Sequence, residues 1–462
     1  MNLFRLVSEV QRKVNTLEYD SQKTSDMNSF TQRCIAPDCQ TEYKIDERLY
    51  VCSRCGGLLD VVVSRDEAHD ATALRELWRE RKSSLDVRNR SGVWRFREFL
   101  PFAEDAEVVS LGEGNTPLYE APRSADYCRL SQLRLKHQGC NPTGSFKDTG
   151  MTVAVTQARK LEARFVACAS TGNTAASLAA YAARADLPCA IIVPGGQVSH
   201  AKLAQALDYG AKVLEVEGNF DTCMNVIREL SEDGAVYLVN SINPFRIEGQ
   251  KTVAFELAEQ LEWRVPDHLV LPGGNLGNSS AFGKGFRELF QSGLIDRLPK
   301  ITVVQAAGAA PFARFYREHD VFINEEHPET LASAIKIGAP VSWPKAWRAV
   351  SETGGSVITV TEQEIADAKA VIGRDGIGCE PASATTVAGI RKLVQDGGIK
   401  ENETVVAVLT GHLLKDTDYV MKYHSRSLIA PDGERLASNF GNSPIRVSSV
   451  ESVAKVINDI GS

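Results

Sequence analysis

The sequence lacks any apolar stretch approaching the roughly 20 residues that cross a bilayer. Its first residues, MNLFRLVSEVQRKVN, contain scattered charges and lack the apolar core of a secretory signal. Basic residues do not exceed acidic ones, 52 against 59, and the net charge of -7 argues against nucleic acid or an anionic membrane as a partner. We therefore expect a soluble, cytoplasmic protein in which residues 1–26 are an extension outside the main fold.

The ten cysteines do not form a disulfide framework. Most are scattered through apolar or mixed sequence, which is typical of a reducing compartment, but Cys34, Cys39, Cys52 and Cys55 form a cluster. Two short-spaced pairs separated by a hairpin-sized segment suit tetrahedral zinc coordination, although the first spacing is wider than usual. A zinc ion bound by four protein ligands would be structural. The alternative is four reduced thiols in a small loop.

Apolar strand candidates alternate with helix-like segments along the rest of the chain. The expected strands are Leu58–Val63, Phe165–Ala169, Ala190–Val193, Lys212–Val216, His268–Leu271, Ile301–Ala306 and Val405–Leu409. The expected helices include Gly150–Lys160, Thr174–Ala183, His200–Tyr209, Asn225–Leu230 and Ala281–Phe290. This alternation predicts an α/β fold with mostly parallel sheets, helices on both faces and ligands at the carboxyl ends of strands. The charged stretch 65–105 is interpreted as a solvated connector.

A lysine lies where a turn meets a predicted helix, in Asn141-Pro-Thr-Gly-Ser-Phe-Lys147-Asp148. The partial positive charge of a helix N-terminus lowers the pKa of a lysine there and favours a nucleophilic amine. An exposed capping lysine is the ordinary alternative for any single lysine, so the neighbouring motifs decide between the two.

Two turns between a strand and a helix suit anions. They are Ser170-Thr-Gly-Asn173-Thr174 and Gly273-Gly274-Asn275-Leu276-Gly277-Asn278. Helix N-termini attract anions, and glycines let backbone N–H groups converge on a phosphate. The second turn lacks both the Lys-Ser/Thr ending of a P-loop and the G-x-G-x-x-G pattern, so it predicts a phosphate cup rather than a nucleotide site. Each turn alone is also compatible with ordinary capping.

Two further polar segments follow strands or precede helices. Thr410 ends a predicted strand and could hydrogen-bond a buried ring nitrogen, whereas His412 is interpreted as structural. Asn240, Ser241 and Arg246 combine amide, hydroxyl and guanidinium groups, which suit a second phosphate or a carboxylate. A surface arginine is the alternative interpretation.

Together these motifs and an early Gly112-Glu-Gly-Asn-Thr-Pro117 resemble the fold-type II pyridoxal-phosphate (PLP) enzymes, in particular the plant-like branch of the threonine synthase family. The resemblance runs from about Leu111 to Lys415. It implies two open, mostly parallel α/β domains plus a small N-terminal zinc-ribbon-like module, which many bacterial and archaeal members carry. The expected boundaries are 1–26 for the extension, 27–63 for the module, 64–140 with 235–462 for the large domain, and 141–234 for the small domain.

The resemblance also implies residue roles. Lys147 would form the Schiff base and shuttle protons. The other cofactor contacts would come from Asn173, Gly274, Asn275, Leu276, Gly277, Asn278 and Thr410. The substrate contacts would come from Ser170, Thr174, Asn240, Ser241 and Arg246. Many relatives have arginine at Thr149 and glycine at Leu413, and these departures leave the substrate specificity open.

The implied activity is that of a homodimeric lyase of threonine biosynthesis, which converts O-phospho-L-homoserine and water to L-threonine and phosphate. A sister enzyme, such as cysteate synthase or a threonine dehydratase, would share the fold. Dehydratases tend to have an all-glycine cup, so Asn275 and Asn278 argue against them. The other alternative is a non-catalytic binding homologue, against which the retained Lys147 and intact cup argue.

Overall fold

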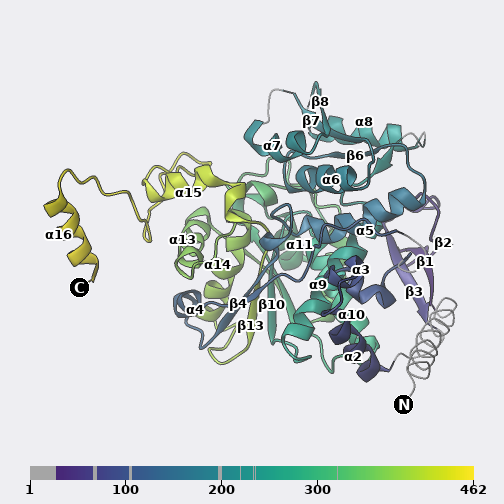
Figure 1. The fold of residues 1–462 in the computed structure, drawn as a ribbon, viewed down its shortest axis with the longest axis horizontal. Coiled ribbons are helices and arrows are strands. Elements are labelled where there is room, and N and C mark those ends of the chain that lie inside the picture. The colour runs from purple at the N-terminus through teal and green to yellow at the C-terminus, as the bar shows by residue number, and fades with distance from the viewer. Residues whose placement is uncertain are drawn as a thin grey trace, which may run out of the picture.

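The structure, a computed structural model, describes residues 28–65, 70–102, 107–195, 200–218, 220–232, 234, 236–319 and 321–461. The expected extension 1–26 lies outside these residues. Two α/β bodies lie one above the other, and the small cysteine module packs along their side (Figure 1). No helix in the described part of the chain is long and apolar enough to cross a membrane.

The larger body is built on a six-stranded sheet with the order β12-β11-β10-β13-β5-β4. Its strands are β4 (Leu118–Glu120), β5 (Leu133–His137), β10 (His268–Pro272), β11 (Lys300–Ala306), β12 (Ser356–Val360) and β13 (Val405–Leu409). All neighbours are parallel except β4 and β5. The apolar runs at β10 and β13 are buried throughout, because helices cover both faces. The predicted α/β class is confirmed.

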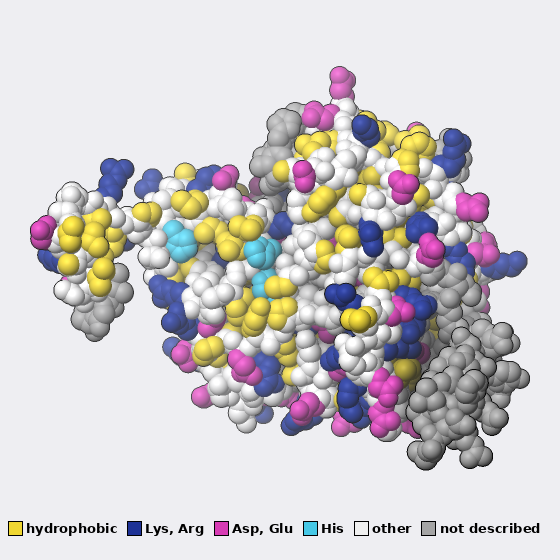
Figure 2. Space-filling model, in the orientation of Figure 1, with side chains coloured by type: hydrophobic (Ala, Val, Ile, Leu, Met, Phe, Trp, Pro, Cys, Tyr) yellow, Lys and Arg dark blue, Asp and Glu magenta, His cyan; other side chains and the backbone are white. Residues whose placement is uncertain are grey.

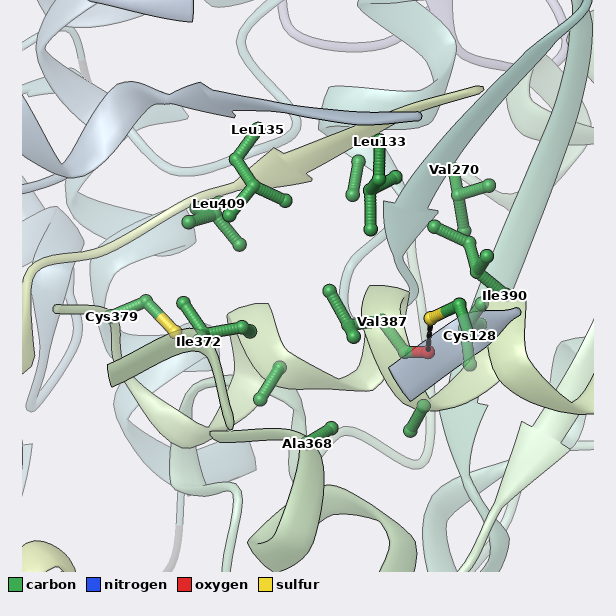
Figure 3. Close-up of a cluster of buried hydrophobic side chains, with 14 of the residues drawn as sticks. Cys128, Leu133, Leu135, Val270, Ala368, Ile372, Cys379, Val387, Ile390 and Leu409 are labelled. Carbon is green, nitrogen blue, oxygen red and sulfur yellow. Dashed lines mark hydrogen bonds between the residues drawn. The ribbon is translucent and has the colours of Figure 1, made fainter. Parts of the chain in front are cut away.

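Two separate cores pack against the two faces of this sheet. The helices of the larger body are α4 (Pro122–Cys128), α9 (Pro244–Gln260), α10 (Gly277–Gln291), α11 (Pro311–Glu318), α12 (Trp343–Glu352), α13 (Glu362–Arg374), α14 (Pro381–Gln395) and α15 (Thr417–His424). Figure 3 shows one core, where Leu135 and Leu409 from the sheet face Ile372 and Val387 from the helices. Cys128 donates its S–H to the carbonyl of Val387 at 3.5 Å, so this thiol is a packing residue.

The smaller body has a four-stranded parallel sheet with the order β8-β7-β6-β9. Its strands are β6 (Val166–Ala169), β7 (Cys189–Pro194), β8 (Lys212–Val216) and β9 (Tyr237–Leu238), and its helices are α5 (Lys147–Lys160), α6 (Asn173–Arg184), α7 (His200–Asp208) and α8 (Phe220–Glu232). The predicted strands and helices differ from these by a few residues at their ends. The boundary expected at 235 needs correction, because β9 pairs with β6 and extends the small body past that point.

The stretch 65–105 is not the solvated connector that its charges suggested. It forms α2 (Ala71–Arg81), α3 (Val87–Arg90) and a 3-10 helix, η1 (Trp94–Phe99). Trp78, Phe96 and Phe99 are fully buried against Phe255 of α9, with Phe99 and Phe255 edge to face at 4.8 Å. Charged residues, among them the fully buried Arg95, alternate with large aromatic residues, and burial of those rings holds the segment to the body.

Helix α9 crosses α5 at two glycines and is buried over nearly its whole length. A Cβ atom at Gly150 would lie 2.7 Å from the carbonyl oxygen of Arg246, and one at Gly249 would clash with the carbonyl oxygen of Thr149. Only glycine allows two backbones to approach this closely. The crossing therefore brings the N-terminus of α5, at Lys147, beside the N-terminal turn of α9.

The C-terminal helix α16 (Val450–Gly461) stands apart from the body in this structure (Figure 1) and carries an apolar stripe (Figure 2).

We expect Gly249→Ala to destabilise the protein by about 3 kcal/mol, because the added methyl overpacks the α5–α9 contact. Gly373→Ala in α13 is the matched control, since nothing lies within 4 Å of its Cβ position and alanine favours a helix by about 1 kcal/mol. Chemical denaturation of both variants measures the difference. Equal unfolding midpoints would contradict the close crossing.

Candidate active site

Lys147 is the first residue of α5 and is half-buried. The turn before it is tied to the end of β13, because the Phe146 N–H donates to the Thr410 carbonyl at 2.9 Å. Burial lowers the pKa of Lys147 well below its ordinary value, the positive charge of Arg246 lowers it further, and Glu380 acts in the opposite direction. Burial therefore favours a neutral, nucleophilic amine here, whereas the sequence suggested the helix N-terminus as the cause of a lowered pKa.

Asp148 fixes the turn that carries the lysine. Its carboxylate accepts hydrogen bonds from the Thr143 N–H at 2.7 Å, the Thr143 hydroxyl at 2.6 Å and the Ser177 hydroxyl of α6 at 2.6 Å. Burial raises the pKa of Asp148 to about 6, and these hydroxyl and N–H donors oppose the shift. The buried carboxyl group thus connects the lysine turn to α6, and it lies at the junction of two predicted motifs.

The loop between β10 and α10 is the predicted phosphate cup. Leu276 adopts a left-handed conformation with φ of 64°, and no side chain caps the N-terminus of α10 that follows. A Cβ atom at Gly273 would lie 2.7 Å from Gln305, so no side chain can fill the loop there. Asn278 Oδ1 and Ser279 Oγ are buried and have no hydrogen-bond partner among the described residues. The uncapped N–H groups and the orphaned Ser279 hydroxyl can donate to an anion, whereas Asn278 Oδ1 can only accept a hydrogen bond.

Asn275 fastens the cup loop to a neighbouring segment. Its side-chain oxygen accepts a hydrogen bond from the Val341 N–H at 3.1 Å, and its carbonyl accepts one from the Ser342 N–H at 3.3 Å. The side chain therefore anchors the cup to the segment before α12 (Trp343–Glu352).

Thr410 and Asn173, both predicted to contact a cofactor ring, are joined by Glu380. The Asn173 amide donates to one carboxylate oxygen at 3.0 Å, and the Thr410 hydroxyl donates to the other at 3.2 Å. Thr410 also exchanges a hydroxyl–hydroxyl hydrogen bond with Ser383 at 3.0 Å. Burial raises the pKa of Glu380, while Asn173, Thr410, Lys415 and Lys147 act against that shift.

Glu380 and Ser383 were missed by the sequence reasoning. In the sequence, Glu380 appears only as an acid directly before Pro381 at the start of α14, and this pattern is typical of an ordinary helix cap. The structure shows that the Glu380 side chain makes no capping hydrogen bond and turns toward Asn173 instead.

Arg246 lies in the first turn of α9 with 2% of its surface exposed. Its Nη1 reaches the Val239 carbonyl only at 3.5 Å, and its Nε has no partner among the described residues. Among the described residues, no carboxylate forms a salt bridge with Arg246. Burial lowers its pKa to about 10. A buried cation without a counterion is costly, so this position suits a ligand that brings negative charge.

The other predicted substrate residues lie at the carboxyl edge of the small sheet. The Ser170 hydroxyl accepts from the Gly172 N–H at 3.2 Å, Thr174 is in the first turn of α6, and Ser241 lies between β9 and α9. Asn240 uses its amide differently, because it donates to and accepts from the backbone of Ala169 at 3.0 Å each. That pairing continues the β6–β9 ladder, and a substrate contact by Asn240 stays a prediction.

His412 occupies a structural position, in line with its interpretation from the sequence. Its Nδ1 accepts from the Leu414 N–H at 3.2 Å, and its ring stacks on His137 at 6.3 Å between centroids.

The four clustered cysteines converge in a three-stranded module formed by β1 (Asn28–Cys34), β2 (Glu42–Lys44) and β3 (Leu59–Arg65). All four sulfur atoms lie within 4.8 Å of one another, with Cys34–Cys55 at 3.4 Å and Cys39–Cys52 at 3.6 Å. A tetrahedral zinc site with bonds of about 2.3 Å has sulfur–sulfur edges of about 3.8 Å. The residues present fit such an ion.

The cysteine module contacts both bodies. Tyr50 accepts a hydrogen bond from the Leu238 N–H of β9 at 2.7 Å, and its ring packs edge to face on Tyr237. On the other side, Asp60 of β3 pairs with Lys284 of α10 at 3.0 Å. Burial alone would raise the pKa of Asp60, but Lys284 and Lys345 lower it below its ordinary value, so the carboxylate is charged.

Sequence comparisons place the chain among known enzymes. Residues 109–411 match the family of pyridoxal-phosphate dependent enzymes. The threonine synthase of Methanocaldococcus jannaschii is 47% identical over 394 residues, which cover 85% of this chain and 94% of that protein. The threonine synthase of Synechocystis is 46% identical over 351 residues, covering 75% of this chain and 89% of that protein.

Solved structures of related enzymes share the fold. Threonine deaminase isoform 2 from Solanum lycopersicum is similar with a TM-score of 0.57 at 20% identity, over 78% of this chain and 95% of that chain. Diaminopropionate ammonia lyase from Escherichia coli has a TM-score of 0.59 at 15% identity, over 76% of this chain and 92% of that chain. At these identities the likeness shows the fold alone. On the sequence relatives, the chain belongs to the threonine synthase family of pyridoxal-phosphate dependent enzymes.

Proposed function

We propose that the protein converts O-phospho-L-homoserine and water to L-threonine and phosphate. The observation that carries this proposal is Arg246, a buried guanidinium with no carboxylate partner in the described part of the chain, next to Lys147. The cofactor's own phosphate has a separate cup at Gly274–Asn278. A second cationic position beside the reactive amine is therefore available for a phosphate on the substrate.

The residues present fit pyridoxal phosphate. Lys147 would hold its aldehyde carbon, the cup and Ser279 its phosphate, and Asn173 its ring hydroxyl. Thr410, whose hydroxyl here donates to Glu380 and is also hydrogen-bonded to Ser383, would turn its O–H to the ring nitrogen. When bound, the cofactor supplies an electron sink for charge that develops on the substrate.

Lys147 is suited to move protons between neighbouring carbons of the substrate. Its lowered pKa favours the neutral amine, which can accept a proton. Arg246 is one cause of that lowering, so a dianionic group bound at Arg246 would offset it and make the lysine more basic. In this proposal, the substrate phosphate both binds the enzyme and adjusts its proton carrier.

Arg246 would also hold the phosphate in the orientation needed for its departure. A guanidinium presents two parallel donors to one phosphate, which fixes direction as well as position. The rigid α5–α9 crossing keeps this fork at a constant place relative to Lys147.

We further propose that the cysteine cluster binds a structural zinc ion, and that the protein is a cytoplasmic homodimer. The sulfur positions support the zinc, and the two-sided contacts of the module support a stabilising role. The homodimer rests on the family resemblance, and the cytoplasmic location rests on the scattered cysteines that lack a disulfide framework.

Purified protein should be yellow, and Lys147→Ala should lose the visible absorbance of the lysine-bound cofactor or shift it toward that of the free aldehyde. The change removes the only amine placed at that point by α5. An absorbance spectrum taken with and without added pyridoxal phosphate tests this. A colourless wild-type protein that takes up no added cofactor would falsify the assignment.

Arg246→Ala should lower kcat/KM for O-phospho-L-homoserine by on the order of 3 kcal/mol or more, because a buried dianion loses its partner. Arg246→Lys should also be impaired, since a fork becomes a point charge. The cofactor spectrum should stay intact, and activity toward an unphosphorylated analogue should barely change. Equal losses on both substrates would mean that Arg246 holds the shared carboxylate or the fold.

Metal analysis should find about one zinc per chain, and the metal should be lost from a Cys52→Ser/Cys55→Ser variant, because thiolates provide the affinity. The unfolding midpoint should fall, while activity per folded molecule persists. Cys140→Ser, at an exposed cysteine outside the cluster, is the control and should keep the metal. The proposed zinc site would be rejected if wild-type protein purified without chelator contained no zinc.

A further inference from the structure

A cavity of about 460 Å³ opens between α13 and α15, away from the Lys147 site. Figure 1 shows these two helices next to each other on the side of the large body that carries the C-terminus. The loop 376–379 and the segment 440–442 complete its walls. Much of the lining is apolar or aromatic and comes from Ile377, Leu413, Val420, Tyr423 and Phe440.

The charged residues of this lining are Lys369 and Arg374, and no carboxylate belongs to the lining that the structure describes. His424 also lines the cavity, but burial lowers its pKa, Lys369 and Arg374 lower it further, and its Nδ1 accepts a hydrogen bond from the Asn442 N–H. Arg374 also lies over the Phe440 ring at 5.0 Å, which leaves its guanidinium at the rim.

Two acids lie near this cavity without lining it. Asp367 accepts hydrogen bonds from the Tyr423 hydroxyl at 2.7 Å and the Asn439 amide at 2.8 Å. Asp416 acts on Lys369 and raises its pKa against the lowering effect of burial, but it lies outside the lining. The lining therefore carries two cationic side chains over an apolar floor, and Asp416 offsets part of the charge of Lys369.

The walls are fixed by hydrogen bonds. The Phe440 N–H donates to the Tyr423 hydroxyl at 3.2 Å, and the Asn442 N–H donates to His424 Nδ1 at 3.0 Å. The segment 440–442 is thereby fastened across α15, so the cavity is formed before any ligand arrives. Preformed pockets with an apolar lining and a few polar groups are the usual form of small-molecule sites.

The loop 376–379 connects this cavity with the active site. The Gly378 carbonyl accepts a hydrogen bond from His137 Nε2 at 2.8 Å. The backbone of Cys379 pairs with that of His412 in an isolated antiparallel β-bridge. The next residue is Glu380, whose carboxylate joins Asn173 and Thr410. A displacement of this loop would move the carboxylate that orients both side chains.

We propose that this cavity binds a small organic anion, a carboxylate or phosphate on an apolar body, and that binding is transmitted to the active site through Glu380. Lys369 and Arg374 receive the anionic group, and Ile377, Leu413 and Phe440 receive the apolar body. The binding itself is independent of the proposed reaction, so it can be tested even if the substrate assignment fails.

The binding test uses the dye 8-anilinonaphthalene-1-sulfonate, an aromatic anion, titrated into the holoenzyme and followed by fluorescence. We expect saturable binding that weakens about tenfold or more in Lys369→Met and in Arg374→Met, because each loses a charge-assisted contact. Lys422→Met is the matched control, on α15 but outside the lining, and should bind as wild type does. Equal affinity in all four proteins would overturn the site.

Phenyl phosphate and benzoate are then tested as competitors of the dye. The compound that displaces the dye at the lower concentration shows which anionic group the cavity prefers. Displacement by neither compound would count against the proposal.

Transmission to the active site is read from the visible spectrum of the bound cofactor. This spectrum should shift when the dye saturates the wild-type protein. It should stay unchanged in Glu380→Gln, although that variant still binds the dye. A wild-type spectrum that does not respond would overturn the link through Glu380.

Discussion

The contact between α5 and α9 at Gly150 and Gly249 is the constraint on which the rest of the site depends. It brings two helix N-termini together and places Lys147 and Arg246 within electrostatic reach of each other. Arg246 is buried and Lys147 is half-buried, and the charge of Arg246 lowers the pKa of Lys147. The arrangement favours a neutral lysine and leaves the arginine in need of an anion.

Elsewhere on α9, buried charges are matched inside the protein. Glu248 pairs with Lys251 at 2.6 Å and with Lys284, and Glu256 pairs with Lys136. Such pairs satisfy charges that burial would otherwise make costly, and the Lys284 pair also links α10 to the cysteine module through Asp60. Arg246 is the exception on this helix. The contrast between a helix with matched charges and one unmatched cation at its N-terminus supports the proposal that Arg246 binds an anionic group.

Much of the fold could be predicted from the sequence, because buried parallel strands appear as apolar runs and βα turns carry glycine and capping residues. β9 could not, since a two-residue strand has no periodicity, and the segment from α2 to η1 was obscured by charges that alternate with its buried rings. In the site, Lys147 and the cup were predicted from local chemistry. The partners of Asn240, Asn275 and Glu380 were not, because a short polar side chain selects among neighbours that only the tertiary structure brings together.

The central claim is that the enzyme breaks the carbon–oxygen bond of a phosphorylated substrate and adds water to carbon. The most direct measurement incubates the purified protein with O-phospho-L-homoserine in water enriched in heavy oxygen and analyses the products by mass spectrometry. The account predicts threonine and phosphate in equal amounts, with the heavy oxygen in the threonine hydroxyl and none introduced into phosphate. Heavy oxygen in the phosphate, or release of 2-oxobutanoate in place of threonine, would contradict it.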